Sequence, residues 1–237
     1  MGKISKFTLP LLITVAGAFA ATSWGMVFAL DMQDKQNMKR FEGVDTSLFL
    51  TNSDGKPLFL PTKKGQINLN LSSYFNEEQT KLIKQGITDL DITAKGLEYK
   101  YANSNGDYIY IVPMAPEIQN NPDYATTIGL TEYNFTGMQI KYPITISINE
   151  QLINQFPPVA YELVVKHELL HTLGFKDLYD EEDRTNLMYY GLTGNDMSQK
   201  EIETLNKVYD KKYTGLVITQ KPNQVIYIPQ KEETLEN

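Results

Sequence analysis

The sequence contains no cysteine, so the chain forms no disulfide bond, no thiolate metal site and no cysteine-linked lipid anchor. Histidine is nearly absent as well, because His167 and His171 are the only two in the chain. Lysine and arginine together number 22 against 29 aspartates and glutamates, which gives a net charge of −7. This acidic balance argues against a nucleic acid as a partner, because the phosphate backbone attracts basic surfaces.

A long uncharged run near the beginning stands out from the rest of the chain. After a basic start, residues 7–30 carry no charged side chain. A basic start followed by an apolar stretch predicts an export signal, and the small residues Ala18 and Ala20 suit cleavage after Ala20. The same stretch is long enough to span a bilayer as an uncleaved membrane anchor. Both interpretations place the rest of the chain outside the cytoplasm, either secreted or periplasmic, or anchored to the membrane.

The two histidines stand four residues apart, with Glu168 directly after the first. On a helix this spacing puts both imidazoles on one face, where they can bind a single Zn²⁺ ion. The carboxylate of Glu168 then lies where a general base can reach a water molecule at the metal. Chance produces this bare pattern in about one chain in a hundred or fewer at this length. The alternative, two ordinary core or surface histidines, is therefore disfavoured.

A third protein ligand has to be an oxygen atom, because the chain offers no other histidine and no cysteine. Asp177 is the first candidate. Gly174 can adopt a positive φ, end the helix and turn the chain so that a residue three positions later faces the same metal. Asp180 is a second carboxylate within reach. The acidic run 177–183 is compatible with a Ca²⁺ site, although a solvated loop explains it equally simply.

The residues 167–177, HELLHTLGFKD, followed by NLMYY at 186–190, resemble the metzincin clan of zinc endopeptidases. The resemblance implies that Met188 lies in a turn beneath the metal and that Tyr190 binds the metal or steadies the transition state. An aspartate as third ligand resembles the snapalysin-type minority, whereas the sequence around Met188 resembles that of matrixins. The additional negative charge of Asp177 should make the metal a weaker Lewis acid. We therefore expect an effect on catalytic strength rather than on metal binding.

The hydrophobic pattern predicts the elements around this motif. Alternating apolar residues and helical periodicity place strands at 66–71, 97–101, 108–112, 125–133 and 144–148, and helices from Asn76, from Pro157 and from Ser198 to about Tyr209. This order indicates an α+β domain. The metzincin resemblance implies a twisted, mostly parallel sheet with an antiparallel edge strand, an active-site helix and a C-terminal helix. It also implies that the edge strand, here Thr127, Gly129 and Thr131, pairs with the extended backbone of a substrate.

Four segments follow from these patterns. We expect a signal peptide or membrane anchor at 1–30, an N-terminal extension or inhibitory pro-segment at 31–65, a catalytic domain at 66–213 and a tail of unassigned role at 214–237. Turn residues between short apolar runs predict a hairpin in the second segment. A cysteine switch is excluded; if that segment blocks the metal, an aspartate such as Asp45 or Asp54 could take its place.

The combined prediction is an exported zinc endopeptidase that acts on protein or peptide substrates. One catalytic Zn²⁺ would be held by His167, His171 and Asp177, with Glu168 as general base and Tyr190 at the oxyanion. Two alternatives remain open. In the first, Glu201 is the third ligand, as in gluzincins. In the second, the chain is an exported module that binds zinc or peptide without cutting it. The sequence assigns no oligomeric state.

Overall fold

The computed structural model describes residues 34–101, 107–213 and 224–231. Two compact units divide the chain, Met1–Lys39 and Arg40–Asn237. In the first unit the described residues 34–38 are helical. The predicted export segment, 1–30, lies outside the described residues. Within the described part of the chain, no helix is both long enough and apolar enough to cross a membrane.

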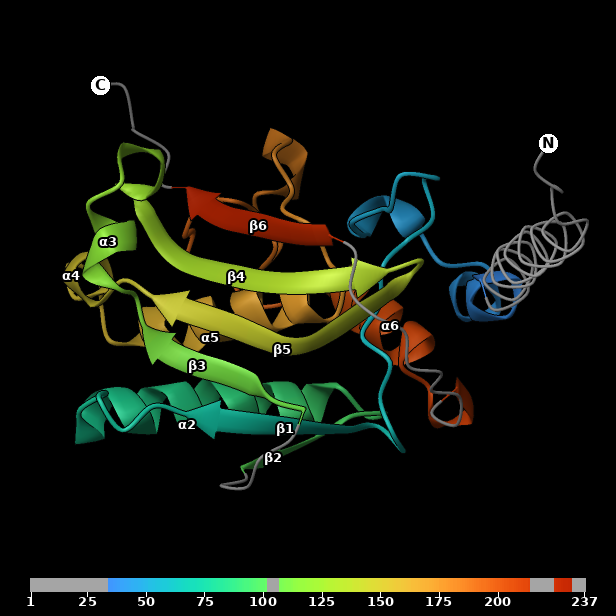
Figure 1. Ribbon diagram of the computed structural model, residues 1–237, viewed down its shortest axis with the longest axis horizontal. Coiled ribbons are helices and arrows are strands. Elements are labelled where there is room, and N and C mark those ends of the chain that lie inside the picture. The colour runs from blue at the N-terminus through green and yellow to red at the C-terminus, as the bar shows by residue number, and fades with distance from the viewer. Residues whose placement is uncertain (1–33, 102–106, 214–223, 232–237) are drawn as a thin grey trace, which may run out of the picture. The chain divides into compact units, whose positions relative to one another are not determined.

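A six-stranded sheet forms the centre of the second unit, with the spatial order β2-β1-β3-β5-β4-β6 (Figure 1). Its strands are β1 (Gln66–Leu71), β2 (Glu98–Tyr101), β3 (Ile109–Pro113), β4 (Thr127–Thr136), β5 (Gln139–Ile148) and β6 (Gln224–Lys231). The strands β2, β1, β3 and β5 run parallel, β4 is antiparallel to β5, and β6 is antiparallel to β4. The predicted α+β class, with a mostly parallel sheet and an antiparallel strand beyond it, is confirmed. The sequence analysis did not foresee that β6 adds to the outer side of β4.

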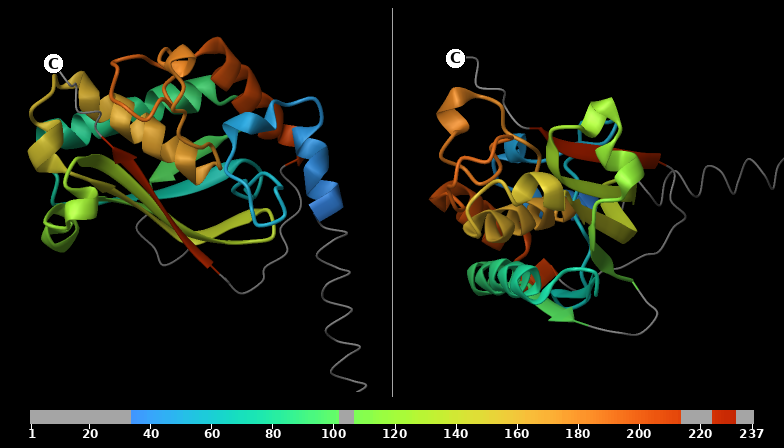
Figure 2. Two further views of the ribbon diagram at one scale, coloured as in Figure 1. Left: turned by 90° about the horizontal axis from the view of Figure 1, so that it is seen from above. Right: turned by 90° about the vertical axis from the view of Figure 1, so that its left-hand side faces the viewer.

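Three helices cover one face of this sheet (Figure 2). They are α2 (Glu77–Thr93), α5 (Val159–Thr172) and α6 (Gln199–Val208). The connections carry the short α3 (Pro116–Gln119) and α4 (Glu150–Ile153) and the 3-10 turns η1 (Lys39–Phe41), η2 (Thr46–Leu48), η3 (Pro122–Tyr124), η4 (Glu181–Asp183) and η5 (Lys211–Tyr213). The sequence predicted the three long helices at these places.

Side chains at the helix starts explain where α2 and α6 begin. The Asn76 side chain accepts a hydrogen bond from the backbone of Gln79, and Gln79 returns one to the backbone of Asn76. Ser198 and Glu201 form the same reciprocal pair at the start of α6. Each pair satisfies backbone N–H groups that have no partner within the helix.

Helix α5 is buried along nearly its whole length, from Leu163 to Thr172, between the sheet and its neighbours. Its polar residues His167, Glu168 and His171 are at most 1% exposed. A buried ionisable side chain requires a partner, because burial removes the water that stabilises its charge. The neighbours of these three side chains therefore determine whether each one is charged.

The segment 40–65 packs into the core of the second unit. A hairpin closes around residues 52–56, with the Asn52 N–H 2.9 Å from the Lys56 carbonyl and the Leu58 N–H 2.8 Å from the Leu50 carbonyl. The hairpin prediction is confirmed. The side chains that follow it, Leu58, Phe59 and Leu60, are at most 1% exposed. Whether the segment acts as a pro-segment stays a prediction.

Candidate metal centre

Gly174 ends helix α5 and turns the chain back toward the histidines, as its position predicted. Its φ is +98°, a conformation that glycine adopts without a steric penalty. A side chain here would also collide with the carbonyl of Leu58. The N–H of Phe175 bonds the carbonyl of Leu170 at 3.1 Å, which closes the helix end. The following residues consequently pass beside the last turn of α5 instead of continuing its axis.

Backbone carbonyls fix the orientation of both imidazole rings. Nδ1 of His167 lies 2.8 Å from the carbonyl oxygen of Leu187, and Nδ1 of His171 lies 2.9 Å from that of Phe175. A carbonyl oxygen only accepts, so each ring donates from Nδ1, and in the neutral ring the lone pair is then on Nε2. Hydrogen bonds of this kind orient histidines that bind metals.

Asp177 lies where the two Nε2 atoms meet. Its Oδ1 is 3.1 Å from Nε2 of His167 and 3.4 Å from Nε2 of His171, and the residue is 5% exposed. Burial acts to raise the pKa of Asp177, but the two histidines outweigh it and hold that pKa well below its usual value. At these distances a proton on an imidazole can bridge to the carboxylate, and the same three atoms can instead hold a cation.

Glu168 faces strand β4 on the other side of this group. The Thr131 hydroxyl donates to Oε2 of Glu168 at 2.5 Å, and Oε1 has no hydrogen-bond partner. Gly129 leaves room for the carboxylate, since a Cβ at this position would collide with Oε1. Burial raises the pKa of Glu168 to about 7, although His167 and the Thr131 hydroxyl act in the opposite direction. The environments of Glu168 and Asp177 therefore shift their pKa values in opposite directions.

Met188 lies in a buried turn held by Glu201. The N–H groups of Leu187 and Met188 donate to the two carboxylate oxygens of Glu201 at 3.2 and 2.9 Å. Ser198 donates to the same carboxylate from both its N–H and its hydroxyl, at 2.6 and 2.9 Å. These bonds engage Glu201 with the turn and the helix start, which argues against Glu201 as the third ligand. The Leu187 carbonyl of this turn is the one that orients His167.

Tyr179, which interacts with Asp177, stacks on Tyr190. The rings of Tyr179 and Tyr190 stack with their centroids 5.1 Å apart, and the Tyr190 N–H bonds the carbonyl of Leu178 at 3.0 Å. Burial, the charge of Asp177 and a hydrogen bond with its carboxylate raise the pKa of Tyr179. The sequence analysis singled out Tyr190 and missed Tyr179. The only signal for Tyr179 was its position two residues after the candidate ligand.

The segment before the sheet braces the Gly174 turn. The Leu50 N–H bonds the Gly174 carbonyl at 2.8 Å, and the Lys176 N–H bonds the Leu48 carbonyl at 3.0 Å. The rings of Phe49 and Phe175 pack at 4.6 Å. The Phe175 carbonyl orients His171, so residues 48–50 support this candidate ligand through their contact with Phe175.

The two carboxylates proposed as metal blockers in the N-terminal segment make other contacts. Asp45 accepts from the N–H of Ser47 at 3.0 Å and pairs with Lys200 at 2.7 Å. Asp54 is exposed in the hairpin turn. Neither is among the side chains that gather at the histidines.

Thr127, Gly129 and Thr131 lie on strand β4, which is paired on both sides, with β5 and with β6. Thr127 and Thr131 are fully buried, and β6 pairs with the outer side of the strand. In this arrangement β6 takes the side of the strand on which a substrate backbone would pair, and the role of this stretch in substrate binding stays a prediction. Thr131 binds Glu168 through its side chain.

Within the described residues, the acidic run 177–183 forms no cluster of three or more potential metal ligands. Among the described residues, the side chains that come close enough to hold an ion are those of His167, Glu168 and His171 on α5, whose ligand atoms lie within 4.8 Å of one another. Asp180 is exposed at the start of η4. A calcium ion and the role of Asp180 remain predictions without support from a cluster.

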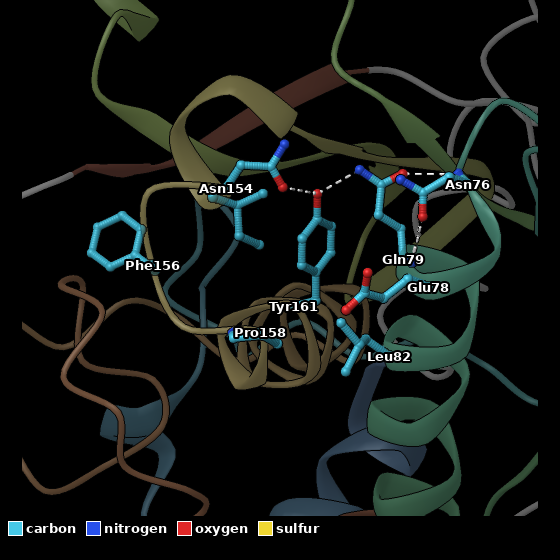
Figure 3. Close-up of a pocket in the computed structure, with 9 residues that line it drawn as sticks. Asn76, Glu78, Gln79, Leu82, Asn154, Phe156, Pro158 and Tyr161 are labelled. Carbon is cyan, nitrogen blue, oxygen red and sulfur yellow. Dashed lines mark hydrogen bonds between the residues drawn. The ribbon is translucent and has the colours of Figure 1, made fainter.

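A separate pocket of about 180 Å³ lies at the other end of α5, between α2 and α4 (Figure 3). The hydroxyl of Tyr161 lies near its centre. It accepts from the Gln79 amide at 2.9 Å and donates to Asn154 at 3.0 Å. No candidate residue of the metal centre lines this pocket.

The side chains of the candidate metal centre are suited to hold a metal ion. Nε2 of His171 and Oε1 of Glu168 are buried without a hydrogen-bond partner in the described structure. Six other buried side-chain atoms of the described residues also lack a partner, but these two belong to one group whose ligand atoms lie within 4.8 Å of one another, which favours a ligand between them. The donor set of two imidazoles with carboxylates suits Zn²⁺. The fold and the site thus define an α+β protein with a buried His-Glu-His group that can hold a divalent metal ion.

Comparisons with known proteins do not assign an activity to this chain. Neither a protein-family model nor a curated protein matches the chain. Among solved structures, the chain is similar to high choriolytic enzyme 1, a hatching enzyme zinc-protease of the medaka fish Oryzias latipes. The match has a TM-score of 0.42 and 14% identity, and covers 68% of this chain and 98% of the other. At these values the likeness carries no functional argument, so the following proposal rests on the chain's own side chains.

Proposed function

We propose that the protein is an exported zinc endopeptidase. The observation that carries this proposal is the contrast between two buried carboxylates beside one histidine pair. Asp177 has a lowered pKa and lies against both Nε2 atoms, whereas the pKa of Glu168 is raised to about 7. When their environments shift the pKa values of two carboxyl groups in opposite directions, the group with the lower pKa stays an anion and the other can act as an acid and a base. Export follows from residues 7–30 and remains part of the proposal.

His167, His171 and Asp177 would hold the metal, each through the atom described above. When bound there, zinc supplies Lewis acidity, which polarises a carbonyl and lowers the pKa of water. The Leu187 and Phe175 carbonyls keep the two rings in the tautomer that binds metal. The Glu201 carboxylate fixes the turn that contains Leu187 and Met188.

Glu168 would move the proton during peptide hydrolysis. Its Oε1 is free to accept a proton from the attacking water, while Thr131 holds Oε2 in place. Glu168 would then deliver that proton to the amine that leaves. A pKa near 7 suits both steps, because a base and its conjugate acid are then both available near neutral pH. Tyr190 or its neighbour Tyr179 would donate a hydrogen bond to the oxyanion.

The test compares cleavage of a quenched peptide by the full chain and by Glu168→Gln, with zinc content measured on both. We expect Glu168→Gln to retain zinc and to lose roughly 100- to 10,000-fold in kcat, the contribution of a general base. Glu162→Gln, the same change on the same helix, is the matched control and should keep full activity. A zinc-loaded chain that cuts nothing, even after removal of β6, would favour the binding module instead.

A further inference from the structure

Strand β6 covers the side of β4 that faces away from β5. It pairs antiparallel with β4 along most of its length, with Gln224 opposite Phe135 at one end and Lys231 opposite Thr127 at the other. Figure 1 shows β6 lying along β4 at the border of the sheet. The pairing is irregular between Thr127 and Leu130.

The stretch of β4 beside the candidate general base is among the residues that β6 covers. Ile228 lies opposite Thr131, and Pro229 lies opposite Leu130. Thr131 is the residue whose hydroxyl binds the carboxylate of Glu168. The backbone of β6 therefore passes the metal centre at the level of its proposed base.

Backbone pairing with a sheet edge is a general way to bind an extended peptide. One side of a strand pairs with only one other strand at a time, because each N–H and C=O on that side has one place in the ladder. We propose that β6 occupies the place of an extended peptide substrate on β4 and acts as a built-in competitive blocker. This inference rests on the proposed function and adds a means of regulating the same site.

The chemistry of β6 suits a blocker that substrate can displace. The pairing of β6 with β4 is interrupted between Thr127 and Leu130, so the ladder there is less regular than that of an ordinary strand pair. The tail also belongs to the same chain, which gives it an effective concentration in the millimolar range for a short connection. A weak strand at a high effective concentration blocks the site without sealing it permanently.

The first experiment measures peptide cleavage by the full chain and by a chain that ends at Tyr213. For a blocker at an effective concentration of about 1 mM and a Kd of about 0.1 mM, removal lowers KM roughly tenfold and leaves kcat unchanged. An unchanged KM would overturn the inference and leave the proposed function standing.

A second variant keeps the full length, because removal of an edge strand can cause aggregation. Amide groups alternate in direction along a strand, so the double change Ile226→Pro and Tyr227→Pro removes a donor toward β4 whichever way the strand is turned. This variant should reproduce the lower KM. The matched control, Thr234→Pro and Leu235→Pro, introduces the same residues beyond β6 and should leave KM unchanged.

A binding measurement separates this inference from the proposed function. A fluorescent peptide of residues 223–232 is titrated with the chain ending at Tyr213 that also carries Glu168→Gln, so that no turnover is needed. Saturable binding, lost when the peptide carries the two prolines, supports the inference even if the protein cuts no substrate. Equal binding of both peptides, or no binding of either, overturns it.

Discussion

Helix α5 carries a polar cluster at each end, and the two clusters differ in how their atoms are satisfied. At the N-terminal end, the Tyr161 hydroxyl accepts from Gln79 and donates to Asn154. At the C-terminal end, Nε2 of His171 and Oε1 of Glu168 are buried with no hydrogen-bond partner. The first cluster completes its bonds within the chain. The second is complete only when something else binds.

This difference separates a structural network from a binding site. A satisfied polar network fixes the packing of the helices around it, and its removal affects mainly stability. Buried polar atoms without partners lower stability, so they persist where a ligand or a reaction uses them. Changes at the two ends of α5 should therefore separate metal binding from stability.

The largest effect is expected for Asp177→Ala at the C-terminal end. Loss of an outer partner of a metal ligand typically weakens metal binding by about 10- to 100-fold, and loss of a ligand should exceed that range. We expect the zinc Kd to rise by at least about a hundredfold, measured by competition with a chelating dye. Asp180→Ala, an exposed carboxylate three residues further on, is the control. Equal weakening by both changes would mean that Asp177 is no special ligand.

The second effect is a pH dependence of the metal-free protein. The pKa of Glu168 rises from 4.5 to about 7 on folding, so the folded chain binds more protons than the unfolded chain between these values. Stability therefore falls as pH rises through this window, by up to about 3 kcal/mol from this group. Asp177 acts with the opposite sign, but below its ordinary value of 3.8.

Urea unfolding of the metal-free chain at pH 5 and pH 8 measures this dependence. Glu168→Gln should remove most of the loss and be more stable than the wild type at pH 8. If the two proteins lose equal stability between these pH values, Glu168 is not the group responsible.

A smaller effect is expected for Glu201→Gln, which weakens the support of the Met188 turn. A charged acceptor for two backbone N–H groups is replaced by a neutral amide, at a cost of about 2 kcal/mol in the free energy of unfolding. Zinc affinity should fall as well, because the turn orients His167. The control Glu203→Gln lies on the exposed side of the same helix and should change stability by less than about 0.5 kcal/mol. Similar losses in both variants would remove the special role of Glu201.

The smallest effect is expected at the N-terminal end, for Tyr161→Phe. Loss of the hydroxyl leaves Gln79 and Asn154 beside a pocket that water can enter, so the cost should be about 1 kcal/mol. Zinc affinity and kcat should equal those of the wild type. A fall in either would show that the two ends of α5 are coupled.

Local pattern was sufficient to predict much of the metal centre. The four-residue spacing of the histidines, the glycine at position 174 and the caps at Asn76 and Ser198 each act within one or two turns of chain. The helices and the first five strands follow from periodicity for the same reason. The fold class was therefore accessible from the sequence.

Contacts between distant segments could not be predicted in this way. Glu201 was considered as a metal ligand, whereas its carboxylate binds the N–H groups of residues thirteen and fourteen positions earlier. Thr131 binds Glu168 across 37 positions. No local signal in the sequence shows which strand β6 joins. These pairings depend on tertiary packing, which a single sequence does not display.

Zinc content tests the central claim most directly. The full chain is saturated with zinc, dialysed and analysed for metal by mass spectrometry, beside His171→Ala prepared in the same way. The wild type should retain about one zinc ion per chain and the variant almost none, because both histidines are needed to hold the ion. A wild type that retains no zinc, or a His171→Ala chain that retains as much, would contradict the assignment of this site.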